Sequence, residues 1–226
     1  SSLPLGLNRI RIERSLTTSA LAEVVLGAEG GKLDKKECQK AMRENPAVDI
    51  ALFGRMAAED PSLNYDAAAQ VAHAISTHAV QNEFDFFTAL DDCAPEGSMG
   101  AAHMDTAEYN SSTLYRYATV NIGELASHLG GRTPEAVRVF LQAFLCSMPT
   151  GKRNSYANNT LPDAVYVAIR RDQPLNLAGA FEKPVTAGVD GYVQPSMKAF
   201  VRHAKALYRD YLGEPEAAFA IGSGMA

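Results

Sequence analysis

The fold of this chain is decided by the sequence between Val48 and Ile122, whose main blocks read 48-VDIALFGRMA-57, 71-VAHAISTHAV-80, 84-FDFFTALDDC-93, 101-AAHM-104 and 111-SSTLYRYATVNI-122. The segment from Val48 to Met56 predicts a strand, in which Gly54 allows a bulge or a close approach of two backbones. Residues Tyr115 to Ile122 alternate in polarity and predict a second strand. Between them, residues 94–112 are rich in Gly, Pro, Ser and Asn, as loops are. The chain is therefore expected to leave one strand, make a long excursion and return to another.

The flanking sequence predicts mostly helices. They are expected over Arg14–Leu26, Asp34–Asn45, Thr133–Met148 and Pro195–Leu212, with one more strand over Ala164–Arg170. Thr133 suits an N-cap, Pro134 suits the first helical position, and Gly213 follows the last helix. The apolar stripe of that last helix is expected to comprise Phe200, Ala204, Leu207 and Tyr211. Strands and helices without a G-x-G-x-x-G loop indicate an α+β domain rather than a nucleotide-binding one.

Acidic residues are concentrated in one segment. The whole chain has 21 Lys and Arg against 26 Asp and Glu, a net charge of −5. From Ala57 to Tyr115 there is no Lys or Arg but there are 10 acidic residues, which leaves 21 bases against 16 acids in the rest of the chain. Because neutralised phosphates supply much of the affinity of proteins for nucleic acids, this segment is suited to avoid phosphates, and the remainder tolerates them. A merely solvated acidic surface explains the same pattern.

Composition excludes several classes of protein. With 226 residues the chain can form a sizeable core. No apolar stretch approaches the roughly 20 residues that cross a bilayer, and the first residues lack the features of a signal peptide, so we expect a cytoplasmic protein with no membrane partner. Cys38, Cys93 and Cys146 lie far apart without C-x-x-C spacing, which argues against a disulfide framework or a zinc site.

The blocks quoted above, together with 152-KRNSYA-157, 176-NLAGAFEKPV-185 and 191-GYVQPS-196, resemble the CasC family, the repeated backbone subunit of the type I-E CRISPR surveillance complex Cascade. The resemblance covers about two thirds of the chain. It implies an RRM-like (ferredoxin-like) palm with helical fingers and an inserted hairpin thumb. By this resemblance residues 1–47 form the fingers segment, 48–79 and 114–226 the palm, and 80–113 the thumb, and Val71–Val80 is a strand. The amino-terminal RNA-contacting segment of the family is not found in Ser1–Glu44 and is expected to be absent.

The family implies a function as well as a fold. Its members are non-enzymatic RNA-binding scaffolds, and several copies stack head to tail along the guide RNA for antiviral recognition of target DNA. The partners implied are therefore the CRISPR guide RNA, the target DNA strand paired to it, neighbouring copies of the same chain and other Cascade subunits. Neither a catalytic residue nor a metal or other cofactor is expected.

Seven residues are expected to contact RNA. The resemblance places Phe87, Thr88 and Met104 in the thumb, against the guide at a displaced base, and Met56 in the palm against the guide. Basic side chains suit phosphates, which favours Lys152 and Arg153 in the loop TGKRNSY and, by family position, Lys183. Simpler interpretations stay open: Phe87 and Met104 also suit a hairpin staple, and the TGKRNSY loop also suits a solvated turn.

A metal-dependent ribonuclease is the alternative. It would use Asp91 and Asp92, with His73 and His78 as the nearest further ligands. The two histidines are five residues apart, so a strand would direct them to opposite faces and a helix would also separate them. Adjacent aspartates diverge when extended, although a loop can bring them together.

Overall fold

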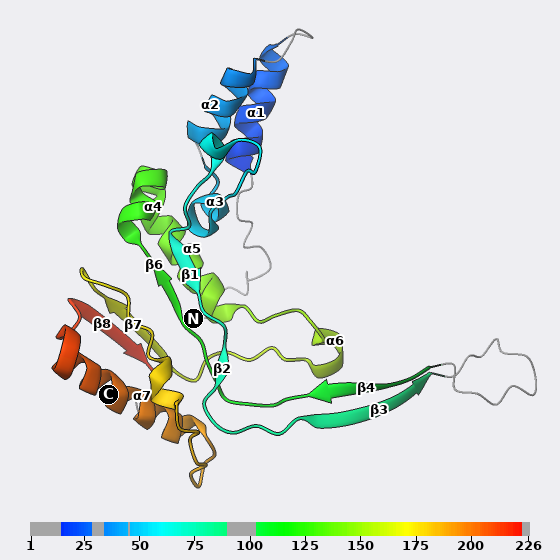
Figure 1. The fold of residues 1–226 in the computed structure, drawn as a ribbon, viewed down its shortest axis with the longest axis vertical. Coiled ribbons are helices and arrows are strands. Elements are labelled where there is room, and N and C mark those ends of the chain that lie inside the picture. Colours follow the sequence, from blue (N-terminus) through cyan, green and yellow to red (C-terminus); the bar gives the residue numbers. More distant parts are fainter. Residues whose placement is uncertain (1–14, 29–33, 45, 90–102, 223–226) are drawn as a thin grey trace, which may run out of the picture. The chain divides into compact units, whose positions relative to one another are not determined.

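The computed structural model describes residues 15–28, 34–44, 46–89 and 103–222, with only the backbone at 15–19, 88–89 and 103–105. The chain divides into two compact units (Figure 1). Unit 1 comprises Ser1–Ala72 and Ala118–Pro162, and unit 2 comprises His73–Tyr117 and Asp163–Ala226. These boundaries differ from those of the fingers, palm and thumb, and that division stays a prediction.

Unit 1 is mainly helical. Its elements are α1 (Ser15–Gly27), α2 (Lys35–Glu44), α3 (Val48–Phe53), η1 (Pro61–Leu63), β1 (Ala69–Val71), β6 (Ala118–Val120), α4 (Ile122–Leu129), η2 (Gly130–Arg132), α5 (Thr133–Cys146) and α6 (Arg153–Tyr156). The helices expected at the two ends of its sequence, α1, α2 and α5, are confirmed. Thr133 is the first residue of α5 rather than its N-cap, and its hydroxyl donates to the carbonyl of Gly130 at 2.7 Å.

The core of unit 1 lies between a short ladder and three helices. β1 and β6 pair antiparallel, with Ala69 opposite Val120. The side chain of Asn121 caps α4 by accepting from the backbone N–H of Glu124 at 3.1 Å. Leu125 is fully buried at the centre of the cluster. The other buried members of this cluster are Ala51, Leu52, Ala68, Ala69, Leu129, Ala136 and Phe140.

The strand expected over Val48–Met56 is wrong, because its first part is the helix α3. A short apolar run has no clear period, and six residues form a single helix whose inner side buries Ala51 and Leu52. The helix ends at Gly54, where φ is +77°, and a Cβ there would lie 2.8 Å from the carbonyl oxygen of Tyr65. The expected close approach at Gly54 is therefore confirmed, although it follows a helix and leads into an isolated bridge between Arg55 and Tyr65.

Unit 2 combines three antiparallel ladders with one long helix. Its elements are β2 (Ile75–Ser76), β3 (Glu83–Ala89), β4 (His103–Tyr109), β5 (Leu114–Tyr115), β7 (Val165–Ile169), η3 (Ala178–Phe181), α7 (Val193–Leu207), η4 (Tyr208–Leu212, a π-helical turn) and β8 (Ala217–Ile221). The pairs β2–β5, β3–β4 and β7–β8 are all antiparallel. The strand expected over Ala164–Arg170 is confirmed as β7.

Two of the expected strands are interrupted. Val71–Val80 contributes only the end of β1 and the whole of β2, and Tyr115–Ile122 contributes the end of β5 and the whole of β6. β1 pairs with β6 in unit 1, whereas β2 pairs with β5 in unit 2, so both segments change unit between their two short strands. The α+β class is confirmed, with four separate two-stranded sheets among the described residues. The RRM-like palm stays a prediction.

The last helix packs against β7 and the η3 turn. The ring of Tyr166 meets that of Phe200 edge-on at 5.7 Å, and the hydroxyls of Tyr166 and Tyr208 are 2.9 Å apart. The expected stripe holds up to Leu207, but Tyr211 is 79% exposed and Tyr208 is buried instead. The π-helical turn, in which the N–H of Gly213 donates to the carbonyl of Tyr208, widens the helix and changes the side that its last residues present. Within the described ranges no helix is long and apolar enough to cross a membrane.

Candidate nucleic-acid interface

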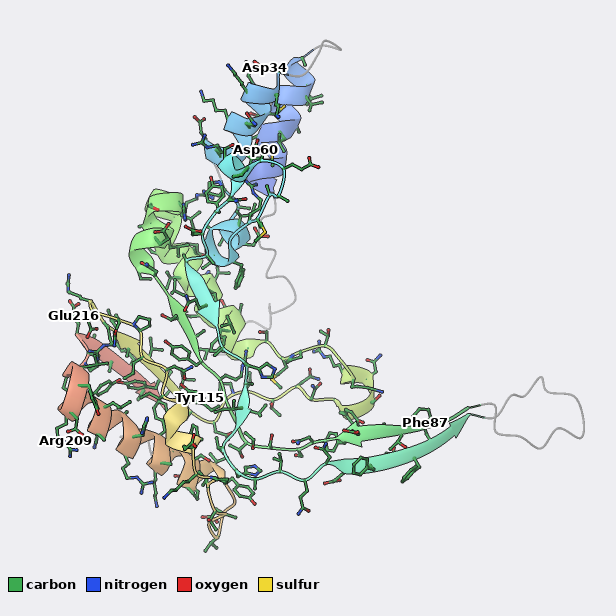
Figure 2. All side chains as sticks on the ribbon, in the orientation of Figure 1. Asp34, Asp60, Phe87, Tyr115, Arg209 and Glu216 are labelled. Carbon is green, nitrogen blue, oxygen red and sulfur yellow. The ribbon has the colours of Figure 1, made fainter. Side chains whose placement is uncertain are left out.

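The hairpin of β3 and β4 presents aromatic side chains on both of its faces. Because side chains alternate along a strand, Phe84 and Phe86 share one face and Phe87 lies on the other. Phe86 is 77% exposed, Phe84 59% and Phe87 43%. The two strands form a long ribbon (Figure 1), and Phe87 lies along it (Figure 2). Family position indicates Phe87, whereas the strand period alone could have indicated Phe84 and Phe86 as well.

The register of the hairpin separates the two residues expected to act together. Phe87 is opposite Asp105, and Met104 is opposite Thr88. Phe87 and Met104 therefore belong to successive register pairs rather than to one cross-strand pair. Successive pairs of a two-stranded ribbon alternate between its faces, so the two positions fall on opposite faces. These two positions therefore do not form a staple of directly opposed residues.

The hairpin carries acidic residues and, by its sequence, no Lys or Arg. Glu83 and Asp85 are exposed on β3, and Glu108 is exposed on β4. At the base of the hairpin the amide of Asn82 donates to Glu108 at 3.2 Å, and the amide of Asn110 donates to Asn82 at 3.2 Å. A surface that combines carboxylates with exposed phenyl rings repels phosphates and suits flat, uncharged groups such as bases.

The root of the hairpin is fixed to the beginning of α7. The backbone N–H of Thr77 donates to the carbonyl of Thr113 at 2.9 Å, and the N–H of Val185 donates to the carbonyl of Thr77 at 2.9 Å. The buried hydroxyl of Thr77 accepts from the hydroxyl of Ser196 at 2.8 Å. His78 completes the root, since its Nε2 accepts from the N–H of Thr113 at 3.1 Å. The hairpin is thus held at one end by an ordered polar network.

The described residues give no support to a metal site. They contain no group of three His, Cys, Asp or Glu side chains that could hold a metal ion. His78 already uses both ring nitrogens, since Nδ1 lies 2.8 Å from the carbonyl oxygen of Ala79. His73 is exposed and its Nδ1 lies 3.0 Å from the carbonyl oxygen of Ala74. Asp91 and Asp92 are outside the described residues.

Met56 is exposed, and both of its neighbours in the chain are fixed by hydrogen bonds. Its side chain is 88% exposed and follows the turn at Gly54. On one side of it, the N–H of Arg55 donates to the carbonyl of Tyr65 at 3.1 Å, and on the other the N–H of Ala57 donates to the side chain of Asn64 at 2.6 Å. An exposed methionine between two fixed neighbours is a suitable apolar contact for a ligand.

Lys152 and Arg153 occupy a single-turn helix with an unusual start. Lys152 has φ of +56° and Ala157 has φ of +48°, both in the left-handed region that residues with a Cβ rarely adopt. The N–H groups of Ser155 and Tyr156 both donate to the carbonyl of Lys152 at 3.0 Å. The lysine, rather than Gly151, therefore takes the strained backbone, and both Lys152 and Arg153 are exposed.

The expected RNA-contacting residues fall into both units. Lys183 is exposed and follows the η3 turn. Phe87, Thr88, Met104 and Lys183 belong to unit 2, while Met56, Lys152 and Arg153 belong to unit 1.

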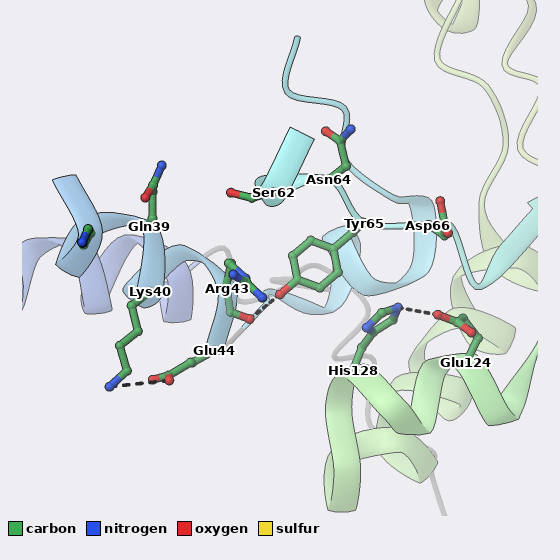
Figure 3. A pocket seen from close by; sticks show the side chains of 11 residues that line it. Gln39, Lys40, Arg43, Glu44, Ser62, Asn64, Tyr65, Asp66, Glu124 and His128 are labelled. Carbon is green, nitrogen blue, oxygen red and sulfur yellow. Dashed lines mark hydrogen bonds and ion pairs between the residues drawn. The ribbon is translucent and has the colours of Figure 1, made fainter. Parts of the chain in front are cut away.

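A polar cavity of about 610 Å³ lies in unit 1 (Figure 3). The rings of Tyr65 and His128 meet edge-on at 5.1 Å, and His128 Nε2 lies 3.0 Å from a carboxylate oxygen of Glu124. The hydroxyl of Tyr65 donates to the backbone carbonyl of Arg43. The remaining lining residues are Lys36, Gln39, Lys40, Glu44, Ser62, Asn64 and Asp66. Charges of both signs line the cavity, so it does not select for an anion such as phosphate.

Comparisons with known proteins found similar chains in RNA-guided assemblies. A family model described as CT1975-like protein matches residues 7–226. A chain of a solved "CRISPR RNA-guided surveillance complex, pre-nicking" is similar at 38% identity and a TM-score of 0.73, over 84% of this chain and 51% of that one. A chain of a second "CRISPR RNA-guided surveillance complex" is similar at 36% identity and a TM-score of 0.66, over 91% of this chain and 72% of that one. The present chain therefore spans about half the length of the first relative. No curated protein matches it.

Proposed function

The chain belongs to the CT1975-like protein family, which confirms its resemblance to the backbone subunits of Cascade, and we propose that it is an RNA-binding subunit of a type I-E surveillance complex. Several copies stack along a guide RNA and associate with other Cascade subunits in the cytoplasm. Target DNA is recognised by base pairing with the guide, so the subunit reads no sequence itself. It is a scaffold rather than an enzyme.

The observation that carries this proposal is the β3–β4 hairpin. Exposed phenyl rings on an acidic ribbon suit contact with bases rather than phosphates, because every base has a flat face that an aromatic ring can meet. Phe87 meets bases at a displaced position of the guide, and Thr88 and Met104 adjoin it in the register. The ribbon reaches the neighbouring copy, so the contact between copies joins two different surfaces and propagates instead of closing into a two-fold dimer.

The other roles follow the same division of charge. Met56 lies against the guide from the palm, which we assign to 48–79 and 114–226 as an RRM-like domain. The ladders β1–β6 and β2–β5 are its short strands. Lys152, Arg153 and Lys183 contact phosphates. All three lie outside the segment from Ala57 to Tyr115, which contains no Lys or Arg.

The test is whether the purified protein holds a discrete small RNA. Protein expressed with a CRISPR array should copurify with RNA of uniform length, and adding long single-stranded RNA should produce filaments whose length follows that of the RNA. Electron microscopy and light scattering measure this. Protein free of RNA, or a two-fold dimer unchanged by RNA, would refute the proposal. Cleavage of the bound RNA only in the presence of Mg²⁺ or Mn²⁺ would favour the ribonuclease with Asp91 and Asp92 instead.

A further inference from the structure

Helix α7 lies along one side of the β7–β8 ladder (Figure 1), and the other side of this ladder is apolar. Tyr166 points to the side of α7, since its ring meets that of Phe200 at 5.7 Å. Because side chains alternate along a strand, the residues on either side of Tyr166 belong to the opposite face. The register pairs on that face are Val165 with Ile221, Val167 with Phe219 and Ile169 with Ala217. We name these six residues the β7–β8 outer face.

The β7–β8 outer face is accessible to a partner. Ile221 is 69% exposed, Phe219 60% and Ile169 49%. The two strands contain no Asp, Glu, Lys or Arg. Within the described ranges each strand pairs only with the other, so the ladder has no third strand to extend its cover. An exposed apolar surface of this kind marks an interaction site.

Helix α1 has an exposed apolar side. Its 13 residues, SLTTSALAEVVLG, include one charged side chain, that of Glu23. The helix packs against α2, but Leu26 is 78% exposed, Val25 is 51% exposed and Ala22 is also exposed. Intervals of three and four residues place these three on one side of the helix, which we name the α1 outer side. Because a helix that is apolar all round is normally buried, this side is expected to meet a partner.

The two surfaces match in size and character. Five register pairs make the ladder about 17 Å long at 3.4 Å per residue, and 13 residues make α1 about 20 Å long at 1.5 Å per residue. A helix is about 10 Å wide, which is also the width of two neighbouring strands. Neither surface contains a charge that would have to leave water. A helix on this face would complete the common arrangement of a sheet with helices on both sides.

We propose that the α1 outer side of one copy packs on the β7–β8 outer face of the next copy. The contact joins two different surfaces, and each copy offers both, so it repeats along a row of copies. The row itself rests on the proposed function. One helix on a two-stranded ladder buries less than the roughly 800 Å² per partner of a stable complex, so isolated copies associate weakly. RNA that holds several copies raises their effective concentration, and the contact then makes RNA binding cooperative.

Cross-linking tests whether the two surfaces meet, and in which chain. The full chain is first freed of its own thiols by replacing Cys38, Cys93 and Cys146 with serine. Single cysteines are then introduced as Val25→Cys or Phe219→Cys, and Val189→Cys is the matched control, because Val189 is fully exposed in unit 2 outside the ladder. Pairs of differently tagged variants are mixed and treated with a short bismaleimide, with and without single-stranded RNA.

The mixture of Val25→Cys and Phe219→Cys should give a dimer that contains one copy of each. On RNA its yield should exceed that of Val25→Cys with Val189→Cys by at least about tenfold, because only the first pair faces each other at high effective concentration. A chain that carries both Val25→Cys and Phe219→Cys, cross-linked at high dilution, reports any contact within one chain.

Charged substitutions test the contact without a cross-linker. Phe219→Asp and Leu26→Asp each place a carboxylate where the contact would bury it unpaired, so each should weaken association of copies on RNA by at least about tenfold. Val189→Asp should stay near wild type. Mixing Leu26→Asp copies with Phe219→Lys copies should restore association between the two, because opposite charges then meet. Sedimentation measures association, and thermal unfolding verifies that each variant is folded.

Three outcomes would overturn the inference. They are equal cross-linking in the Val189→Cys mixture, a cross-link formed only within one chain, and unchanged association of Phe219→Asp. The second would identify α1 of the same chain as the occupant. If Phe219→Asp fails to fold, Ile221→Asp replaces it, and the cysteine variants test the same face independently. Because the mixtures are also cross-linked without RNA at high protein concentration, the expected cross-link in a protein that holds no RNA refutes the proposed function alone.

Discussion

The imidazole of His78 is stacked on the ring of Tyr192, with ring centroids 3.7 Å apart and an interplanar angle of 12°. Since Nε2 accepts from the backbone N–H of Thr113, the proton of the neutral ring lies on Nδ1, which donates to the carbonyl of Ala79. One residue thus joins the root of the hairpin to the segment that begins α7, and it does so only as a neutral imidazole.

Two substitutions of His78 separate its ring stacking on Tyr192 from its hydrogen bond with Thr113. His78→Phe keeps a ring over Tyr192 but leaves the partly buried N–H of Thr113 without an acceptor, so the free energy of unfolding should fall by about 1–3 kcal/mol. His78→Ala also loses the ring contact and should cost about 0.5–1.5 kcal/mol more. Urea unfolding measures both, with exposed His73→Phe as the control. If His78→Phe is as stable as that control, the hydrogen bond contributes nothing.

Single substitutions can assign the proposed RNA contact to one face of the hairpin. Phe87→Ala should weaken RNA binding by about 1–3 kcal/mol for one lost stacking contact. Phe86→Ala removes a more exposed ring from the opposite face, which the Thr88–Met104 pair shares in the register, and should cost less affinity than Phe87→Ala. Binding assays on both variants decide the matter, because the reverse order would assign the contact to the face of Phe84 and Phe86.

Lys152 allows charge and backbone strain to be tested apart. Because its φ is +56°, Lys152→Gly should raise stability by about 1 kcal/mol, whereas Lys152→Ala keeps the strain. Both variants lack the charge, so both should flatten the salt dependence of RNA binding by about 0.7 per lost phosphate contact. Unequal slopes for the two variants would mean that the conformation of the turn, and not its charge, governs binding.

Tyr115 should make unit 2 sensitive to alkali. Burial raises the pKa of its phenol to about 12, above the value of about 10 in an unfolded chain. The folded state therefore prefers the neutral phenol. The contribution of this phenol to the free energy of unfolding is fully present below about pH 10. It declines from there toward pH 12, by up to about 1.4 kcal/mol per pH unit. Burial also raises the pKa of Tyr166, so the two residues act in the same direction.

The variant Tyr115→Phe isolates this contribution. At pH 8 it should be less stable than wild type by about 1–3 kcal/mol, because the N–H of buried Leu177 loses the hydroxyl that accepts it at 3.1 Å. At pH 11 the difference in the free energy of unfolding between the variant and wild type should be smaller, since only the wild type has this phenol to ionise. Urea midpoints at the two pH values test this, and a constant difference would show that Tyr115 does not titrate as proposed.

Gly54 should resist substitution. Gly54→Ala places a Cβ 2.8 Å from the carbonyl oxygen of Tyr65 and forces a side chain into a positive φ, so it should destabilise unit 1 by about 1–3 kcal/mol. Gly131→Ala is the matched control, since a Cβ there meets nothing within 4 Å. Thermal unfolding of the two variants provides the comparison, and an unaffected Gly54→Ala would mean that the turn before Met56 relaxes easily.

The sequence by itself determined the features that depend on local periodicity and on residue order. The helices α2, α5 and α7 have enough turns for their apolar spacing to be distinctive, and β7 is bounded by clear breaks. The order of motifs also indicated the family, because five blocks and their spacing are a linear property of the chain. The absence of Lys and Arg between Ala57 and Tyr115 was likewise visible in the sequence.

Only the tertiary structure decided the remainder, because the deciding contacts join residues far apart in the chain. The segment Val48–Phe53 is the helix α3, in which Ala51 and Leu52 are buried in the core. The segment Val71–Val80 is divided between two strands that pair with different partners. The register of β3 against β4 separated Phe87 from Met104 and revealed Phe84 and Phe86. Pairing and register are relations between distant residues, which no local pattern encodes.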